Sequence, residues 1–276
     1  MQLTKKNILD KLIITPGAKK CFIFDLDGTI IFNDKPLATE YENLLKKIYA
    51  ANHEVIFASG RPVRDFRMLM PDWTHEFSMA LFGGGVSLKA GEIIRKNTIE
   101  PNHCIDLIEI CHKYDYPFIL DDHLNYYHPD KSHHLYEFID SGIVQDYRTK
   151  NLDNILSNDI FKIFILDDLA IDKFSEYVQN TSLALHHHTK FKSFDILPGG
   201  VNKYNGIHHM LDYPSNDIFV FGDDLNDYPL FVKFHNSILM GENHLLNDVA
   251  KLNILNDESR YQNLTYLIDI ILNESM

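Results

Sequence analysis

Four short apolar runs restrict this chain to a sheet that is covered by helices. The runs are Cys21–Phe24, Val55–Ala58, Ile218–Phe221 and Ile238–Met240. Runs of this length without polar residues are typical of strands that are buried on both faces, as in parallel sheets. Helical periodicity recurs over residues 4–13, 37–51, 203–211 and 259–273. We therefore predict an α/β fold with a doubly wound, Rossmann-like parallel sheet.

The middle of the chain has an apolar pattern of its own. It predicts strands near residues 92–97, 117–121, 160–166 and 183–188, and helices near residues 102–113, 132–139 and 169–178. A stretch of about a hundred residues is long enough for a separate α+β domain. We predict a core of residues 1–85 and 191–276, with an N-terminal extension over residues 1–18 and an inserted domain over residues 86–190. The borders are predicted near Gly85 and Phe191.

The balance of charges excludes some classes of partner. Lys and Arg number 26 against 39 Asp and Glu, which gives a formal net charge of −13. Such a surface repels nucleic acid and anionic lipid, so we expect neither a nucleic acid nor a membrane as partner. Three cysteines without C-x-x-C spacing, and no apolar run of membrane-spanning length, lead us to expect a cytoplasmic protein with reduced thiols. The sequence does not indicate the oligomeric state.

Two carboxylates follow the first apolar run directly. Asp25 and Asp27 begin the segment Asp-Leu-Asp-Gly-Thr, at the end of a predicted strand. Ligands of doubly wound sheets bind at the carboxyl ends of the strands. Two aspartates at this place suit a hard metal ion, or a nucleophile with an acid/base partner. An ordinary Asp-Gly turn is the alternative.

Three further clusters occupy equivalent places. Ser59, Gly60 and Arg61 follow the second run, where a hydroxyl, backbone N–H groups and a guanidinium suit phosphate. Residues 222–227, Gly-Asp-Asp-Leu-Asn-Asp, follow the third run and suit a metal ion, or cap the next helix through Asn226 or Asp227. Lys203 stands at the start of a predicted helix. A lone lysine is normally solvated, so its meaning depends on the other clusters.

Together these clusters resemble the motifs of the haloacid dehalogenase-like (HAD) superfamily, in the family's order. The matching residues are Asp25, Asp27, Gly28 and Thr29, then Ser59, then Lys203, then Gly222, Asp223, Asn226 and Asp227. The place of the insert resembles the Cof-like type IIB branch, which carries an α+β cap domain there. The resemblance covers most of residues 19–276. It implies a phosphatase that acts on a small phosphorylated metabolite, with sugar phosphates favoured.

The resemblance also implies roles for these residues. Asp25 would attack phosphorus and form an aspartyl phosphate, and Asp27 would act as general acid and then as general base. Mg²⁺ would be the cofactor, held by Asp25, Asp223 and the backbone carbonyl of Asp27. Ser59 and Lys203 would bind the transferring phosphoryl oxygens. Further phosphate contacts are assigned to Thr29, Gly60, Arg61 and Asn226, and supporting roles around the site to Asp224 and Asp227.

Other functions use some of the same residues. A phosphotransferase or phosphomutase would share Asp25 and Asp27 but would pass the phosphoryl group to an alcohol. A non-catalytic sensor of a phosphorylated ligand would keep the fold, yet none of Asp25, Asp27 and Lys203 is lost. Zinc is a weaker hypothesis, because the paired histidines lack typical zinc spacing. These histidines are His133 and His134, His186 to His188, and His208 and His209.

Overall fold

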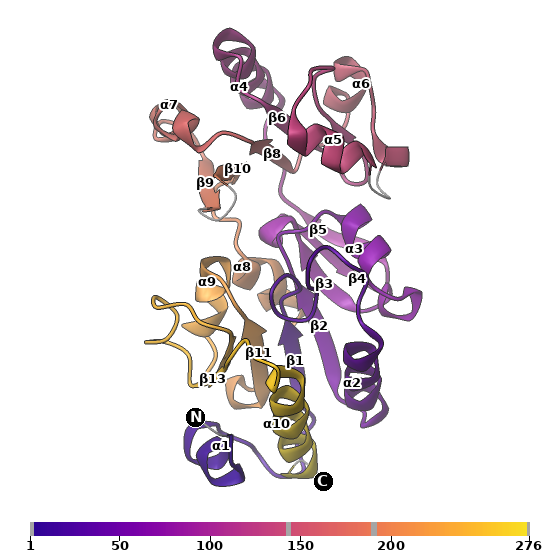
Figure 1. The fold of residues 1–276 in the computed structure, drawn as a ribbon, viewed down its shortest axis with the longest axis vertical. Coiled ribbons are helices and arrows are strands. Elements are labelled where there is room, and N and C mark those ends of the chain that lie inside the picture. Colours follow the sequence, from indigo (N-terminus) through magenta and orange to yellow (C-terminus); the bar gives the residue numbers. More distant parts are fainter. Residues whose placement is uncertain (1–2, 142–144, 189–191, 275–276) are drawn as a thin grey trace. The chain divides into compact units, whose positions relative to one another are not determined.

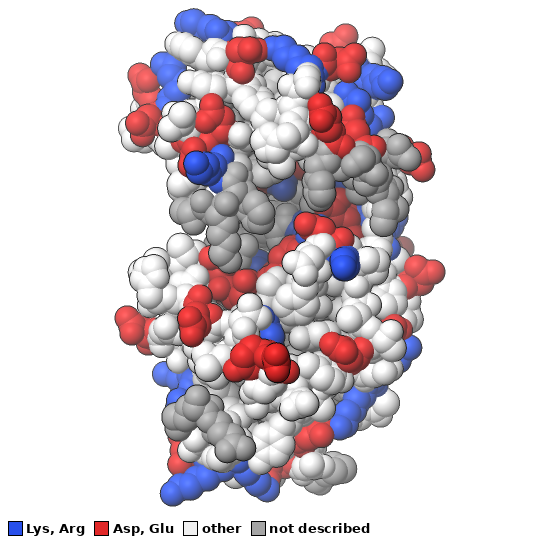
Figure 2. Space-filling model, viewed as in Figure 1, with Lys and Arg blue, Asp and Glu red and all other residues white. Residues whose placement is uncertain are grey.

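The computed structural model describes residues 3–141, 145–188 and 192–274, and the chain divides into two compact units (Figure 1). The first unit comprises Met1–Gly60, Leu69–Ile93 and Asn202–Met276, and the second comprises Arg61–Met68 and Ile94–Val201. No helix of the described residues is long and apolar enough to cross a membrane. Acidic and basic side chains are interspersed over the face shown in Figure 2.

The first unit is built on a sheet of eight strands in the order β13-β12-β11-β1-β2-β3-β4-β5. The strands are β1 (Cys21–Phe24), β2 (Glu54–Ala58), β3 (Ser78–Leu81), β4 (Val86–Lys89), β5 (Glu92–Lys96), β11 (Ile218–Gly222), β12 (Asn236–Met240) and β13 (Leu252–Ile254). Pairing is parallel from β13 to β3, and β4 is antiparallel to β3. The predicted parallel sheet is therefore confirmed.

The pairing register aligns the carboxyl ends of the central strands β1, β2 and β11 along the same edge of the sheet. Phe24 of β1 pairs with Phe57 of β2 on one side and with Phe221 of β11 on the other. The backbone N–H of Asp25 then donates to the Phe221 carbonyl oxygen at 2.9 Å. Residues that follow β1, β2 and β11 consequently leave the sheet side by side.

Side chains of the central strands alternate between two covered faces. One face, with Cys21 and Ile23, packs against residues of α8 and α9, and the other carries the stacked rings of Phe24 and Phe221, 4.6 Å apart. Helices α2 and α10 contact each other through Tyr41. The helices of this unit are α1 (Lys5–Lys11), α2 (Thr39–Ala50), α8 (Lys203–Ile207), α9 (Tyr228–Phe231) and α10 (Arg260–Glu274). The helix predicted over residues 203–211 ends early, because a 3₁₀ turn follows Ile207.

The N-terminal extension is firmly attached to the first unit. Figure 1 shows α1 beside α10. The side chain of Ile8, on α1, is fully buried. Asn236 at the start of β12 accepts from the Ile13 backbone N–H and donates to the Ile13 carbonyl, both at 2.8 Å. Buried Lys20 donates to the Thr15 carbonyl oxygen at 2.5 Å and pairs with Asp217 at 2.6 Å. The extension therefore contributes to the core of this unit.

The second unit has a sheet of five strands in the order β7-β6-β8-β10-β9. Its strands are β6 (Phe118–Asp121), β7 (Tyr126–Tyr127), β8 (Lys162–Ile165), β9 (Leu183–His188) and β10 (Ser193–Pro198). Its helices are α3 (Val63–Leu69), α4 (Pro101–Tyr114), α5 (His134–Ser141), α6 (Leu152–Leu156) and α7 (Ile171–Val178). One face of the sheet packs on α4 and α7 through a cluster that includes Leu107, Phe174 and Phe194. This unit is an α+β arrangement.

Two elements differ from the sequence prediction. The strand predicted near residues 92–97 for the inserted domain is β5, the last strand of the large sheet, so that assignment was wrong. Helix α3 groups with the second unit, because buried Arg64 pairs with Asp121 at the end of β6 at 2.7 Å. The chain passes to the second unit after Gly60 and returns after Met68, and it passes there again after Ile93 and returns after Val201. The predicted border at Phe191 lies outside the described residues.

Candidate active site

Asp25 lies at the centre of the site, directly after β1, and is almost fully buried. Its Oδ1 atom lies 2.6 Å from the Lys203 ammonium. Burial raises the pKa of Asp25 well above its ordinary value, and the nearby carboxylates of Asp227 and Asp223 act in the same direction, while Lys203 opposes them. Asp25 therefore depends on a positive neighbour to stay ionised.

Lys203 is the first residue of α8 and is buried. Asn202 caps the helix by accepting from the Asn205 backbone N–H at 2.9 Å, which fixes the backbone from which the lysine projects. The Lys203 ammonium contacts Asp25 Oδ1 and Asp227 Oδ1, each at 2.6 Å. Burial alone would lower the pKa of Lys203, but the two carboxylates raise it above its ordinary value. Lys203 therefore carries its charge between two acids.

The loop after β11 orients Asp227 toward this lysine. Asp227 Oδ2 accepts from the backbone N–H groups of Asp223 and Asp224, at 3.0 and 3.2 Å. Asp224 is the residue that caps the following 3₁₀ turn, Leu225–Asp227, by accepting from the Leu225 N–H at 2.8 Å. Asp227 occupies the N-cap position of α9 but makes no side-chain cap hydrogen bond there, and its carboxylate instead completes the capping box of the 3₁₀ turn with Asp224.

Three carboxylates of the site fit a hard cation. One oxygen each from Asp25, Asp223 and Asp227 lies within 4.8 Å of the others, the only such group of acidic, His or Cys side chains in the described part of the chain. Both oxygens of Asp227 already accept hydrogen bonds, so Asp25 and Asp223 are the better ligands. Gly28 brings its loop against Asp223: a Cβ there would lie 2.0 Å from Asp223 Oδ2, and its φ of +70° favours glycine. Oxygen donors alone suit Mg²⁺ or Ca²⁺.

The other residues assigned from the sequence lie in different environments. Ser59 is buried after β2, and its backbone carbonyl accepts from the Gly83 N–H at 2.9 Å. Asp27 is exposed, next to Gly28. Thr29 is buried, and its Oγ1 atom finds no hydrogen-bond partner among the described residues.

Three assigned residues are less closely tied to Asp25. Gly60 is half-buried, with open space where a Cβ would point. Arg61 belongs to the second unit, where its guanidinium lies 3.7 Å from Asp65. Asn226 is exposed. The structure thus joins Asp25, Lys203 and the Asp223–Asp227 loop by direct contacts.

Two backbone contacts close to the site were missed by sequence reasoning. Arg260, the first residue of α10, donates to the Gly28 carbonyl oxygen, and a lone arginine carries no motif that would reveal this. Gly84 lies against Asn202, since a Cβ on Gly84 would be 2.1 Å from the Asn202 carbonyl oxygen. From the sequence, a domain border was predicted near Gly85, but this backbone contact was not.

Comparisons with known proteins bear on the family and the fold of this chain. A family model for haloacid dehalogenase-like hydrolases matches residues 22–259. The HMP-PP phosphatase of Enterobacter sp. (strain 638) is 24% identical over 239 residues, which cover 79% of this chain and 82% of that protein. The 5-amino-6-(5-phospho-D-ribitylamino)uracil phosphatase YitU of Bacillus subtilis (strain 168) is 22% identical over 218 residues, covering 74% and 79%.

A solved structure supports the fold. The HAD subclass IIB sugar phosphatase BT4131 matches with a TM-score of 0.71 at 16% identity, covering 91% of this chain and 100% of that one. The predictions of superfamily, fold and enzyme class are confirmed by these matches. The chain therefore belongs to the haloacid dehalogenase-like hydrolase family and is a phosphatase with the subclass IIB fold.

Proposed function

We propose that this phosphatase hydrolyses a small phosphorylated metabolite, with Mg²⁺ bound, through an aspartyl phosphate on Asp25. The observation that carries the proposal is the buried Lys203 ammonium, 2.6 Å from both Asp25 and Asp227. It offers positive charge at a carboxylate that follows the central strand of the sheet. A phosphoryl group needs such charge, because its oxygens carry the developing negative charge.

The first half of the reaction transfers the phosphoryl group to Asp25. A carboxylate oxygen of Asp25 attacks phosphorus and forms a P–O bond as the bond from phosphorus to the leaving oxygen breaks. Asp27, exposed two residues further on, protonates the leaving oxygen, so the alcohol departs neutral. Lys203 favours the ionised form of Asp25 against the effect of burial.

The second half restores the enzyme. Asp27, now a carboxylate, takes a proton from water, and the water oxygen attacks phosphorus while its bond to Asp25 breaks. Ser59 and Lys203 hold the phosphoryl oxygens, with Thr29, Gly60, Arg61 and Asn226 as further contacts. Asp227 keeps Lys203 directed at Asp25, and Asp224 holds the turn that contains Asp227.

A divalent cation completes this site. Asp25, Asp223 and the backbone carbonyl of Asp27 would hold Mg²⁺, which would neutralise charge on the phosphate. Asp223 is suited to this because the Gly28 loop passes directly against its carboxylate. Mg²⁺ accords with the all-oxygen donor set.

The names of the relatives support a proposal for the substrate class. One relative is named for HMP-PP and another for a phosphoribitylamino-uracil, and a structure of the same fold is named a sugar phosphatase. All three names describe small phosphate esters or anhydrides of metabolites. We propose a sugar phosphate first, with phosphorylated cofactor precursors second. The second unit would then serve as the cap domain that selects the leaving group.

The test is phosphate release from a panel of phosphorylated sugars and cofactor precursors, with and without Mg²⁺. We expect release to require Mg²⁺ and to be abolished in Asp25→Asn, whose side chain keeps its shape but is a poor nucleophile. Asp72→Asn changes a fully exposed aspartate of the same unit and should retain activity. Equal release by wild type and Asp25→Asn would refute the proposed nucleophile. An added alcohol that received the phosphoryl group would favour phosphotransfer instead.

A further inference from the structure

Arg260 joins the start of the last helix to the loop that follows Asp25. It is the first residue of α10 and is buried. One guanidinium nitrogen, Nη2, donates to the backbone carbonyls of Gly28 and of Met240, the latter at 3.2 Å. The other, Nη1, donates to Asn256 Oδ1 at 2.8 Å. Three segments distant in sequence therefore meet at a single side chain.

The position of Arg260 is unfavourable for the helix itself. A cation in the first turn opposes the helix dipole, and a buried guanidinium loses its hydration. Burial accordingly lowers the pKa of Arg260, although Tyr41 and Asp223 oppose this effect. Helix stability does not explain an arginine here, so the contacts that the side chain makes are the reason for its place. One of them is the face of the Phe32 ring, 4.8 Å from the guanidinium carbon.

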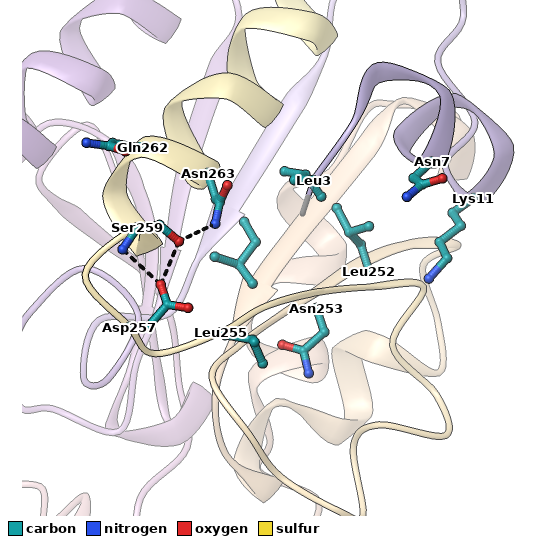
Figure 3. A pocket seen from close by; sticks show the side chains of 11 residues that line it. Leu3, Asn7, Lys11, Leu252, Asn253, Leu255, Asp257, Ser259, Gln262 and Asn263 are labelled. Carbon is teal, nitrogen blue, oxygen red and sulfur yellow. Dashed lines mark hydrogen bonds between the residues drawn. The ribbon is translucent and has the colours of Figure 1, made fainter. Parts of the chain in front are cut away.

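Several hydrogen bonds hold the turn at residues 257–260, from which Arg260 projects (Figure 3). Asp257 Oδ1 accepts from the Ser259 backbone N–H at 2.8 Å and from its hydroxyl at 2.6 Å. Asn263 donates to the same hydroxyl at 2.8 Å. The Arg260 backbone N–H donates to the Asp257 carbonyl at 3.0 Å. The backbone of Arg260 is therefore held in place by the hydrogen bonds of this turn.

Gly28, in contrast, lies in a loop whose backbone hydrogen bonds run mainly within the loop. It is in the left-handed region, with a φ of +70°, between Asp27 and Thr29. Its N–H donates to the Ile31 carbonyl at 3.0 Å, so the loop closes mainly on itself. Gly28 also lies tightly against Asp223. A shift of its peptide would therefore displace Asp27 on one side and press on Asp223 on the other.

We propose that Arg260 is a positioning residue for the reaction: by binding the Gly28 carbonyl it fixes Asp27 relative to Asp25 and Asp223. This inference rests on the proposed function, in which those three aspartates carry out the chemistry. Arg260 touches neither substrate nor metal in this role. Its effect is to hold the acid/base residue where proton transfer is efficient.

The test compares Arg260→Ala and Arg260→Lys with wild type, using a chromogenic aryl phosphate and Mg²⁺. We expect kcat of Arg260→Ala to fall on the order of 100-fold, the usual effect of a displacement of about 1 Å in an active site, with KM near wild type. Added guanidinium ion should restore part of kcat in Arg260→Ala. Lysine should restore less than arginine, because one ammonium cannot replace the planar fork.

A control variant separates positioning from loss of helix packing. Asp269→Asn removes the ion pair of α10 with Lys47 on α2 and leaves Arg260 in place, so kcat should stay unchanged. Full kcat in a folded Arg260→Ala would overturn the inference. A loss of kcat that matches the fraction of unfolded protein and that guanidinium does not restore would also overturn the inference. If Arg260→Ala does not fold, Arg260→Lys gives the same comparison.

Amide hydrogen exchange tests the contact between Arg260 and the Gly28 loop without relying on enzymatic activity. We expect faster exchange at Gly28 and Ile30 in Arg260→Ala than in wild type or Asp269→Asn, because the loop loses its external anchor. If wild type shows no phosphatase activity and exchange still increases, the proposed function has failed and the positioning contact stands. If wild type is active and neither exchange nor kcat changes, the positioning role has failed.

Discussion

A single buried lysine holds the candidate site together. Lys203 contacts Asp25 and Asp227 at equal distances, and both acids are buried. A charge in such a place is favourable only while its partners are present, because the cost of desolvation is otherwise uncompensated. The lysine is therefore expected to matter both for stability and for catalysis.

Removing this charge should reveal both roles. We expect Lys203→Met to lower the free energy of unfolding by about 3–5 kcal/mol, since two buried carboxylates lose their cation. Urea denaturation would measure the loss. Mg²⁺ should restore more stability in this variant than in wild type, because a bound cation then compensates the negative charge of carboxylates that have lost Lys203. Unchanged unfolding in Lys203→Met would contradict the contacts described here.

Neighbouring aspartates in the loop after β11 should behave differently. Asp223→Asn removes a proposed Mg²⁺ ligand, so we expect the Mg²⁺ concentration for half-maximal activity to rise on the order of 10-fold or more. Asp224→Asn is the matched control. Asparagine caps a turn about as well as aspartate, so this variant should keep wild-type Mg²⁺ dependence. Equal shifts in the two variants would argue against the ligand assignment.

At the scale of single elements, the strands were predictable and some helices were not. Strands β1, β2, β11 and β12 are buried on both faces, so a plain apolar run marks each of them. The motifs that follow these strands were predictable for the same reason. Helix α8 ends at Ile207 although apolar residues continue, because the chain tightens into a 3₁₀ turn at His208. Periodicity alone does not distinguish these two helix types.

Between β1 and β2, His53 should make stability depend on pH. Its Nδ1 atom accepts from the Lys20 backbone N–H at 3.0 Å, and its ring packs edge-on against Phe22. Burial lowers the pKa of His53 below its ordinary 6.5, and nearby lysines add to this. The unfolded chain then binds a proton more readily than the folded one, so stability is fully present above pH 6.5 and is lost as the pH falls toward the folded pKa.

Melting temperatures in a series of buffers would measure this effect. We expect the melting temperature of wild type to fall as the pH drops below 6.5, and to fall less in His53→Asn, which keeps an acceptor without titrating. His244→Asn, at an exposed histidine, should follow wild type. If His53→Asn shows the same acid response as wild type, another group is responsible.

At the scale of the whole molecule, the sequence indicated two parts but not which segments belong to each. Local patterns identify strands, but they do not show that β4 and β5 extend the large sheet beyond β3. The place of α3 depends on the contact of Arg64 with Asp121, far along the chain. The role of Arg260 was hidden for a similar reason, since its partner Gly28 lies at the other end of the sequence. The acidic clusters were predictable because each one directly follows its strand.

The ion pair that ties α3 to the second unit gives a test of this division. Both Arg64 and Asp121 are buried, with Arg64 Nη2 2.7 Å from Asp121 Oδ1. We expect Arg64→Met to destabilise the second unit by about 3–5 kcal/mol, and Arg64→Met with Asp121→Leu to be less destabilised, because buried Asp121 is then not left without Arg64. Asp65 keeps its contact with Arg61, and Lys162 keeps its contact with Asp195. Hydrogen exchange in β6 and β8 would measure the change. A double variant that is less stable than the single one would contradict this account.

The contact between Gly84 and Asn202 has a consequence for how such a chain can diversify. These residues lie backbone against backbone within the first unit, although more than a third of the sequence separates them. The long excursion of the chain between them thus begins and ends at one point. Beyond β4 and β5, which belong to the large sheet, its length and content place no demand on the spacing of the core segments on either side. A shorter, longer or unrelated segment in place of the second unit's residues 94–201, with adjacent ends, would fit the same base while Asp25 and Lys203 stay where they are.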